Sequence, residues 1–479
     1  MRNRLLAASA VLIASPAIAA EPTRATPASE KSLPTFTTGA VTTAAAAQGA
    51  QAPLSDADRA QAIQELQDLK ARMSALENKL GVAPPAPVPA APAVPKDHNL
   101  ELYGFAQLDA IQDFKRVDPD WDGTLRPSRI PTEKGAFGSN GQSLFSVRQS
   151  RLGAKASGML AGRPYEAKFE FDLYATGADA GKTTFHLRHA YASWGPFLAG
   201  QTNTLWMDGD VFPNVLDYWG PPGQVNTRTP QIRWTFLKDE HWMAAVALEH
   251  PSDDIDPGNL RLIDPDIAAN IRGDEKLPDL TAAVRYSGGW GHAQLAGILR
   301  RVGYDTIGTD DNEPKGHKTG WGIDASSAIK LSLATLKLSA VYGRGIASYM
   351  NDGGTDLGPA VATQPGPGTI ILLPRAEAVK LLGLTGYVDF QWSKQWASSV
   401  GYSLTKVDNT NFQEPEAFHK GEYASANLLY TPLDNVVTGV EFMWGKRTDN
   451  DGDKGTDTRM QASFKWSFSS KNIWDSLAD

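Results

Sequence analysis

The chain has 479 residues, a formal net charge of −8 at pH 7, 41% hydrophobic residues and a mean hydropathy of −0.33. The acidic balance argues against nucleic acid as a partner, and the polar average argues against a bundle of membrane-spanning helices. No cysteine is present, so an exported form of the chain would carry no disulfide framework.

The first 54 residues predict two segments that precede any folded domain. Residues 1–19 have the features of a secretory signal peptide, because two arginines precede a short apolar stretch that ends in Ala17-Ile18-Ala19. Residues 20–54 are rich in Ala, Thr and Pro and have few groups to bury, which predicts disorder.

Residues 55–81 predict a short coiled-coil helix. Apolar residues recur there with the alternating four- and three-residue spacing of a coiled-coil seam. One helix of this length cannot bury such a seam, so we expect it to self-associate, and docking of the helix on its own barrel is the alternative. Residues 82–97 are rich in Pro and Ala and predict an extended linker. The seam positions are Leu66, Leu69, Met73, Leu76 and Leu80.

Residues 98–479 predict an all-β domain. Sixteen segments between residues 100 and 468 alternate apolar and polar side chains, which places the two kinds on opposite faces of a strand. Short turns and long polar loops alternate between these segments. An even number of strands with this arrangement predicts a 16-stranded antiparallel transmembrane β-barrel, with the short turns and both termini in the periplasm.

Several segments in chain order resemble DcaP-type outer-membrane porins. They are residues 102–110 (LYGFAQLDA), 119–121 (PDW), 126–131 (RPSRIP), 187–191 (LRHAY) and 427–432 (NLLYTP). The resemblance covers roughly residues 100–468. It implies a trimer of 16-stranded barrels, each with its own pore and with a preference for small anionic solutes such as dicarboxylates. One departure is the eleven-residue tail after Phe468, which leaves the register of the last strand open.

The candidate site residues are cations that face the lumen, because rings of Arg or Lys favour the passage of anions. Alternation turns Arg188, Arg233 and Arg285 inward. Arg148 and Arg151 have opposite parity, which requires a β-bulge or a position near the rim. An ordinary salt bridge in the lumen is the competing interpretation for each cation. The candidate pore-lining residues are Arg148, Arg151, Arg188, Arg233, Arg285, Arg300 and Lys168.

The connection at residues 203–227 predicts a constriction loop, since it follows the fifth strand, where general porins fold a loop into the channel. Acidic residues of the loop that face a cationic wall would create a transverse field. Aromatic residues would anchor the loop. The candidates are Asp208, Asp210, Asp217, Trp206 and Trp219.

We predict no enzymatic activity, cofactor or metal, because no nucleophile motif or zinc-type histidine spacing is visible. The expected partners are a homotrimer, outer-membrane lipid and lipopolysaccharide, and small anionic solutes. The expected location is the outer membrane of a Gram-negative bacterium, with the coiled coil in the periplasm. A general or sugar-selective porin, a structural or adhesive barrel and a barrel enzyme are the alternatives.

Overall fold

The structure is a computed structural model that describes residues 64, 65, 68, 71, 72, 98–366 and 369–471. The chain divides into two compact units, residues 1–23 with 97–479 and residues 24–96. The described residues of the second unit are helical and exposed. The predicted signal peptide, disordered segment and linker lie outside the described residues, and so do all five seam positions, Leu66, Leu69, Met73, Leu76 and Leu80.

Twenty strands occur in the described residues, and eighteen of them belong to one antiparallel sheet. They are β1 (Asn99–Asp113), β2 (Gln142–Ser146), β3 (Arg151–Leu160), β4 (Arg163–Tyr174), β5 (Thr183–Trp194), β6 (Phe197–Asn203), β7 (Arg228–Lys238), β8 (Trp242–Glu249), β9 (Ile271–Gly273), β10 (Asp279–Gly288), β11 (Gly291–Thr306), β12 (Gly316–Lys330), β13 (Ala334–Arg344), β14 (Leu357–Gly366), β15 (Thr369–Ala378), β16 (Lys380–Gln391), β17 (Trp396–Asp408), β18 (Phe418–Leu433), β19 (Val436–Asp449) and β20 (Lys454–Ser469).

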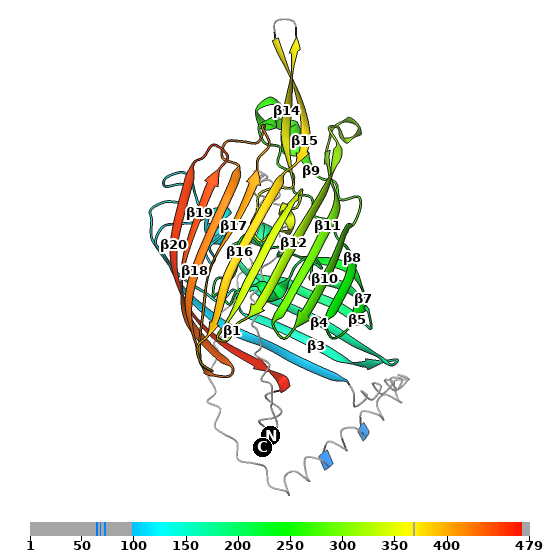
Figure 1. Ribbon diagram of the computed structural model, residues 1–479, viewed down its shortest axis with the longest axis vertical. Coiled ribbons are helices and arrows are strands. Elements are labelled where there is room, and N and C mark those ends of the chain that lie inside the picture. The colour runs from blue at the N-terminus through cyan, green and yellow to red at the C-terminus, as the bar shows by residue number, and fades with distance from the viewer. Residues whose placement is uncertain (1–63, 66–67, 69–70, 73–97, 367–368, 472–479) are drawn as a thin grey trace. The chain divides into compact units, whose positions relative to one another are not determined.

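The sheet closes into a barrel because β1 pairs with β20 on one side and with β3 on the other (Figure 1). β2 and β3 both pair with β1, and β9 and β10 both pair with β11, so each pair of segments fills one position in the wall. The eighteen segments therefore make sixteen wall positions, which confirms the predicted all-β barrel of 16 antiparallel strands. β20 reaches Ser469 and places Phe468 opposite Gly104, which resolves the register of the last strand.

Short helices lie in the connections at the long-loop end of the barrel. None of the helices in the described ranges is long and apolar enough to cross a membrane. They are the α-helices α2 (Leu260–Ile263) and α3 (Pro265–Asn270) and the 3-10 helices η1 (Pro119–Trp121), η2 (Pro127–Arg129), η3 (Gly177–Asp179), η4 (Gly209–Val211), η5 (Asp310–Asn312) and η6 (Ala347–Tyr349).

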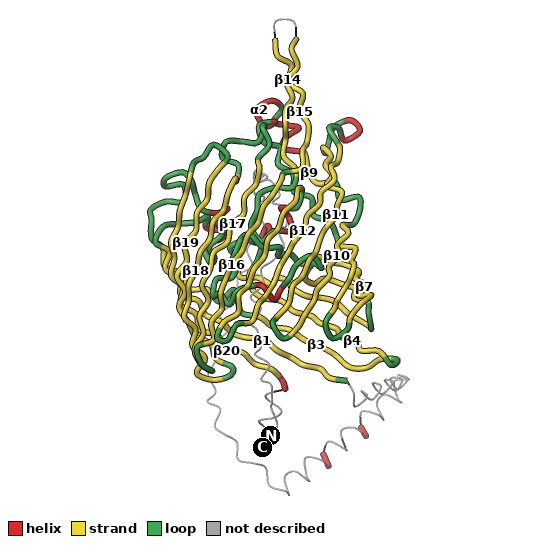
Figure 2. The backbone as a smooth tube through the Cα atoms, viewed as in Figure 1, coloured by secondary structure: helices red, strands yellow, loops and turns green. Residues whose placement is uncertain are grey.

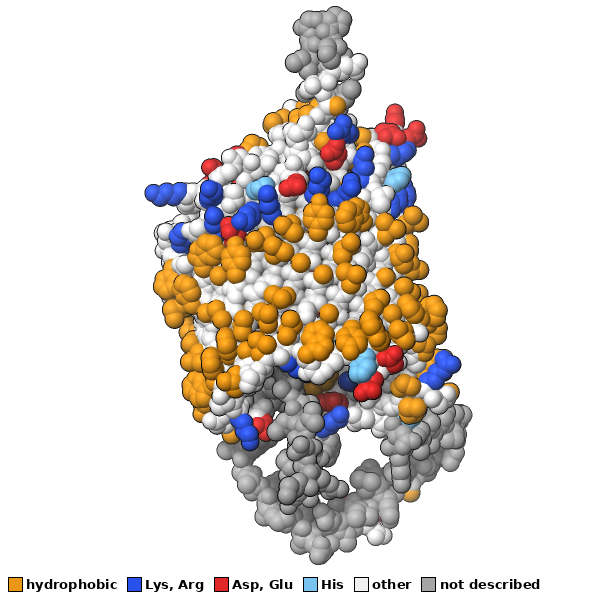
Figure 3. Space-filling view, in the orientation of Figure 1, with side chains coloured by type: hydrophobic (Ala, Val, Ile, Leu, Met, Phe, Trp, Pro, Cys, Tyr) orange, Lys and Arg blue, Asp and Glu red, His pale blue; other side chains and the backbone are white. Residues whose placement is uncertain are grey.

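The wall of the barrel has an apolar outer face and a polar inner face. In β20, Phe464 and Trp466 are each 52% exposed on the outside, whereas Arg459 and Gln461 are buried on the inside. The same period-two pattern recurs in the other strands of the wall, and on the face shown in Figure 3 many hydrophobic side chains lie on the outside of the strands. This arrangement is the one expected of strands that face lipid on one side.

A β-bulge lies between β2 and β3. Five residue steps from Ser146 to Arg151 lie opposite four steps of β1, from Asp109 to Phe105. The extra residue reverses the parity of the strand at this point. Arg148 and Arg151 therefore both face inward, although their spacing in the sequence gives them opposite parity.

Loops from the long-loop end fold into the barrel and form its core (Figure 2). Leu125 and Ile130 of the β1–β2 loop pack with Val215 of the β6–β7 loop and with the inward-facing rings of Tyr387 and Tyr423. The connection between β13 and β16 differs from the polar loop expected there, because it contains the hairpin β14–β15. This hairpin forms a two-stranded sheet separate from the barrel, is bridged at its base to Ile255 through Leu357, and projects beyond the barrel (Figure 1).

Candidate functional site: the barrel lumen

The inner wall formed by β3, β4, β5 and β7 concentrates basic side chains. Arg151, Lys168, Arg188 and Arg233 all point to the inside of the barrel, on β3, β4, β5 and β7 respectively. β5 contains an extra residue at Arg188, because Glu170 lies opposite His189 while Phe171 lies opposite Leu187. The bulge turns both Arg188 and His189 inward, where they are 1% and 8% exposed.

Arg188 is held between two carboxylates. Its Nε donates to Glu170 at 2.9 Å and its Nη1 donates to Asp172 at 2.8 Å. Glu170 also contacts Lys168 at 3.1 Å and Arg151 at 3.7 Å. Three predicted pore-lining cations thus surround one glutamate, and their charges are partly cancelled within the wall.

Three more predicted cations serve as anchors for loops. Arg148 contacts Asp122 of the β1–β2 loop at 2.8 Å, and Arg285 contacts both Asp208 and Asp210 of the β6–β7 loop. Arg300 contacts the carboxylates of Asp253, Asp279 and Asp356, at 3.0, 3.2 and 3.2 Å. Each of these cations faces inward, and each has an acidic partner.

Arg233 differs from the other six candidates. It donates to the side-chain oxygen of Gln231 at 3.0 Å and to the main-chain oxygen of Asn203 at 2.7 Å. Both acceptors are neutral, and no ion pair to Arg233 occurs among the described residues. The guanidinium therefore has no carboxylate in direct contact, and Glu249 on β8 acts on it only from a distance.

Lys465 is a second inward-facing cation without a direct ion pair among the described residues, and it was not among the predicted site residues. It lies on β20, is 7% exposed, and has its Nζ 5.4 Å from the ring centroid of Phe105. Arg151 lies 5.2 Å from the same ring. No ion pair to Lys465 occurs in the described part of the chain. Its parity with Arg459 and Gln461 was the sequence signal that could have identified it.

The β6–β7 loop crosses the lumen and is buried along most of its length. Near one end, Asp208 accepts hydrogen bonds from Ser326 of β12, at 2.8 Å, and contacts His292 of β11 at 2.7 Å. Further along, the main-chain nitrogen of Leu216 donates to Glu441 of β19 at 2.7 Å. The hydroxyl of Tyr218 then donates to Asp172 of β4 at 2.8 Å. The loop is therefore fixed to walls on different sides of the barrel.

Close packing seats the two aromatic candidates of this loop. Trp206 is fully buried, and a Cβ at Gly322 would lie 2.6 Å from its ring, so glycine is needed at that point of β12. Trp219 and Trp121 enclose the guanidinium of Arg126, whose central carbon lies 4.0 and 4.1 Å from the two rings. Burial lowers the pKa of Arg126 to about 10, although Asp352 opposes the shift.

The acidic candidates of the loop form contacts with other groups of the protein. Burial alone would raise the pKa of Asp208, but His292 and Arg285 outweigh it and hold the pKa below its ordinary value. Burial raises the pKa of Asp217, despite hydrogen bonds from Thr124 and from main-chain N–H groups. Asp210 is the exposed member of the three, and it contacts Arg285.

The donor atoms of Asp208, Asp210 and His292 lie within 4.8 Å of one another, which is close enough to consider a metal ion. Arg285, however, contacts both carboxylates. A positive group already compensates this cluster, so we assign no metal to it.

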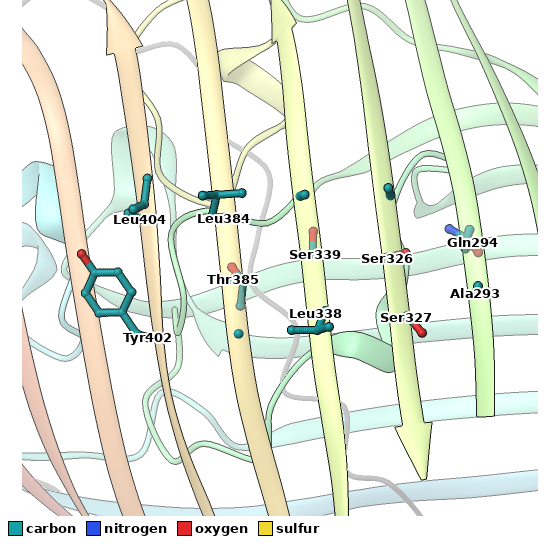
Figure 4. Close-up of a pocket in the computed structure, with 13 residues that line it drawn as sticks. Ala293, Gln294, Ser326, Ser327, Leu338, Ser339, Leu384, Thr385, Tyr402 and Leu404 are labelled. Carbon is teal, nitrogen blue, oxygen red and sulfur yellow. The ribbon is translucent and has the colours of Figure 1, made fainter. Parts of the chain in front are cut away.

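A shallow pocket lies on the outside of the wall, across β11, β12, β13, β16 and β17 (Figure 4). Small residues, among them Ala325, Ala340 and Gly386, form its floor. Leu338 and Tyr402 at its edge are each 40% exposed on the lipid-facing side. The pocket therefore faces the membrane and is not part of the solute path.

Comparisons with known proteins find a matching protein family and similar solved structures. A family model described as DcaP outer membrane protein matches residues 86–356. The crystal structure of the outer membrane channel DcaP of Acinetobacter baumannii is similar over 78% of this chain and 99% of that chain, with 21% identity and a TM-score of 0.63. At this identity the likeness shows the fold alone.

Two further solved structures are more distant. An anion-selective porin from Comamonas acidovorans is matched over 78% of this chain and 100% of that chain, with 10% identity and a TM-score of 0.47. OmpT of Vibrio cholerae is matched over 78% and 98%, with 10% identity and a TM-score of 0.46. No curated protein matches the chain.

Proposed function

Because the chain belongs to the DcaP outer membrane protein family, we propose that it is a porin that admits small, preferentially anionic solutes of the dicarboxylate type. Solutes diffuse passively through water-filled barrels that assemble as a homotrimer in the outer membrane of a Gram-negative bacterium. The single observation that carries the anion preference is the pair of inward-facing cations, Arg233 and Lys465, that form no ion pair with any residue the structure describes.

Charge compensation decides which cations affect selectivity. The guanidinium of Arg188 lies between two carboxylates, so its own charge is compensated within the wall. Arg233 and Lys465 form no such contact in the part of the chain that the structure describes, and a positive group on a wall of low dielectric constant attracts anions from a distance. A dicarboxylate with two negative charges gains more from this field than a neutral solute of the same size.

Reversal potentials in planar bilayers under a KCl gradient test this proposal. We expect the wild-type channel to prefer chloride and the variant Arg233→Gln/Lys465→Gln to lose most of that preference. A matched control, Lys238→Gln/Lys394→Gln, removes the same charge from exposed turns at the short-turn end and should leave selectivity unchanged. Cation preference in the wild-type channel would contradict the proposal.

A structural or adhesive barrel is the second candidate. Two observations favour it: the β6–β7 loop crosses the lumen, and the hairpin β14–β15 projects beyond the barrel (Figure 1). Such a protein would pass almost no current, whereas a porin gives discrete conductance steps. Equal permeation of neutral sugars and organic anions would instead indicate a general or sugar-selective porin.

A further inference from the structure

A row of basic side chains, here called the basic belt, lies on the outside of the barrel at its long-loop end. Each residue occupies the end of a different strand, from β13 to β19, and has the parity of the lipid-facing side chains below it. Figure 3 shows Lys and Arg gathered above the hydrophobic surface on this face. The members are Arg344, Lys380, Lys406, Lys420 and Lys446.

Cations of the belt are direct neighbours across strands. Arg344 lies opposite Lys380, and Lys406 lies opposite Lys420. Like charges directly opposite one another destabilise a sheet, so an anionic group bound between them would relieve the repulsion at these two contacts. Arg344, Lys380 and Lys406 have no ion pair among the described residues.

The acidic side chains nearby do not balance the belt. Glu422 is shared by two of its lysines, Lys420 at 3.1 Å and Lys446 at 3.3 Å. Asp408 lies opposite Lys380 but forms no ion pair within the described ranges. Five basic and two acidic side chains leave this surface positive, which fits an anionic partner.

The opposite ends of the same strands carry no outward-facing Lys or Arg. Outward-facing aromatic residues occur there instead, including Phe390, Trp396 and Tyr430. Aromatic rings suit either membrane interface, whereas a belt of cations at one interface suits a leaflet with anionic headgroups. Because long loops mark the extracellular end of such barrels, this leaflet is the outer one.

The lipid-facing pocket lies on strands that also carry the belt. Leu384 and Leu404, which line the pocket, follow Lys380 by four residues and precede Lys406 by two. A strand rises about 3.3 Å per residue, so the pocket lies roughly 7–13 Å below the charges. A lipid whose headgroup binds the belt would thus have an acyl chain at the level of the pocket.

We propose that the basic belt and the pocket below it form a binding site for a phosphorylated, acylated saccharide lipid of the outer leaflet. Lysine and arginine side chains bind phosphate through charge-assisted hydrogen bonds, and the two neighbouring cation pairs lose their mutual repulsion when a phosphate lies between them. This site is separate from the lumen and does not depend on which solute the barrel admits.

Binding of lipid A to the full chain in detergent micelles, followed by native mass spectrometry, tests the site. We expect bisphosphorylated lipid A to bind the wild-type protein, and Lys380→Gln/Lys406→Gln/Lys420→Gln to weaken binding by about tenfold or more. The control Lys238→Gln/Lys330→Gln/Lys394→Gln removes the same charge at the opposite end of the barrel and should bind as the wild type does.

Two further measurements test whether binding depends on phosphate and whether the belt variant is folded. Lipid A without its phosphates should bind the wild-type protein no better than the belt variant binds intact lipid A. Without lipid, the belt variant should keep about the wild-type resistance to heat, since its substitutions relieve two repulsive contacts and remove one surface ion pair, that of Lys420 with Glu422. Equal binding by the belt variant and wild type, equal loss in the control, or binding independent of phosphate would overturn the proposal, as would a second copy of the chain cross-linked over the belt.

Discussion

At the scale of single residues, the inward orientation of a cation does not determine whether it forms an ion pair. Arg188, Arg233 and Arg285 all lie on the inner face of the barrel. Only the folded chain shows that Arg188 and Arg285 are ion-paired and that Arg233 is not. The competing interpretation, an ordinary lumenal salt bridge, therefore describes the contacts of two of these three residues.

Arg188→Gln should destabilise the barrel more than Arg233→Gln does. The first substitution leaves Glu170 and Asp172 buried without their main cation, which costs about 3–5 kcal/mol of unfolding free energy. The second removes hydrogen bonds to neutral acceptors and should cost on the order of 1 kcal/mol. Urea unfolding in lipid vesicles, followed by tryptophan fluorescence, measures both losses. Equal losses would show that the pairing of Arg188 is not structural.

The loop residue Asp253 predicts a pH dependence. Burial raises its pKa from 3.8 to about 6, although a hydrogen bond from Gly303 and the charge of Arg300 oppose the shift. A carboxyl with a raised pKa in the folded state binds its proton more tightly there than in the unfolded chain. Its ionised form thus destabilises the fold above pH 6, and this penalty is lost as the pH falls through 6 toward 3.8.

Asp253→Asn should therefore be more stable than the wild-type protein at pH 8, with the difference shrinking by pH 5. Arg300 keeps two other carboxylates, so the substitution does not leave it unpaired. Heat denaturation followed by electrophoretic mobility at the two pH values measures the effect. Asp310→Asn, an exposed substitution, serves as the control, and a stability difference that does not change with pH would exclude the titration of Asp253 as its cause.

At the scale of an element, the β6–β7 loop is fixed to the wall on different sides of the lumen, and most of its carboxylates are engaged in contacts. Its carboxylates at Asp208 and Asp217 bind groups of the wall or of neighbouring loops, and its main chain is fixed to Glu441. The loop also passes very close to the wall at Gly223. A Cβ at this residue would lie 2.2 Å from the main-chain oxygen of Leu404. The transverse field predicted from these acids remains a prediction.

Replacing residues 208–220 with a short Gly/Ser linker should raise the single-channel conductance, because the replaced segment crosses the lumen. The control replaces residues 360–375 of the hairpin β14–β15, which pairs outside the barrel sheet and should leave conductance unchanged. Single-channel recordings at fixed salt compare the two variants with the wild type. An unchanged conductance in the loop variant would mean that the segment does not limit the pore.

At the scale of the whole molecule, closure of the sheet joins the first and last strands of the domain through main-chain hydrogen bonds. β1 and β20 pair along eleven residues, from Tyr103 with Ser469 to Asp113 with Arg459. A barrel closed in this way has no free sheet edge and needs no disulfide. The proposed homotrimer then depends on contacts between outer walls and on the predicted helix at residues 55–81.

Deletion of residues 55–81 should weaken trimers only in part, since contacts between barrels should also hold them together. The heat resistance of trimers on gels measures this effect, with deletion of residues 20–54 as the control. Identical heat resistance of the 55–81 deletion and the wild type would show that the coiled-coil seam is irrelevant to assembly.

The sequence by itself determined the barrel and its strand number, because period-two alternation is a local property that each strand carries within itself. Tertiary structure alone decided the charge partners, the crossing of the lumen and the projecting hairpin. Those features depend on groups far apart in the chain, such as Leu216 and Glu441, which are 225 residues apart. Only closure of the barrel brings such groups within hydrogen-bonding distance.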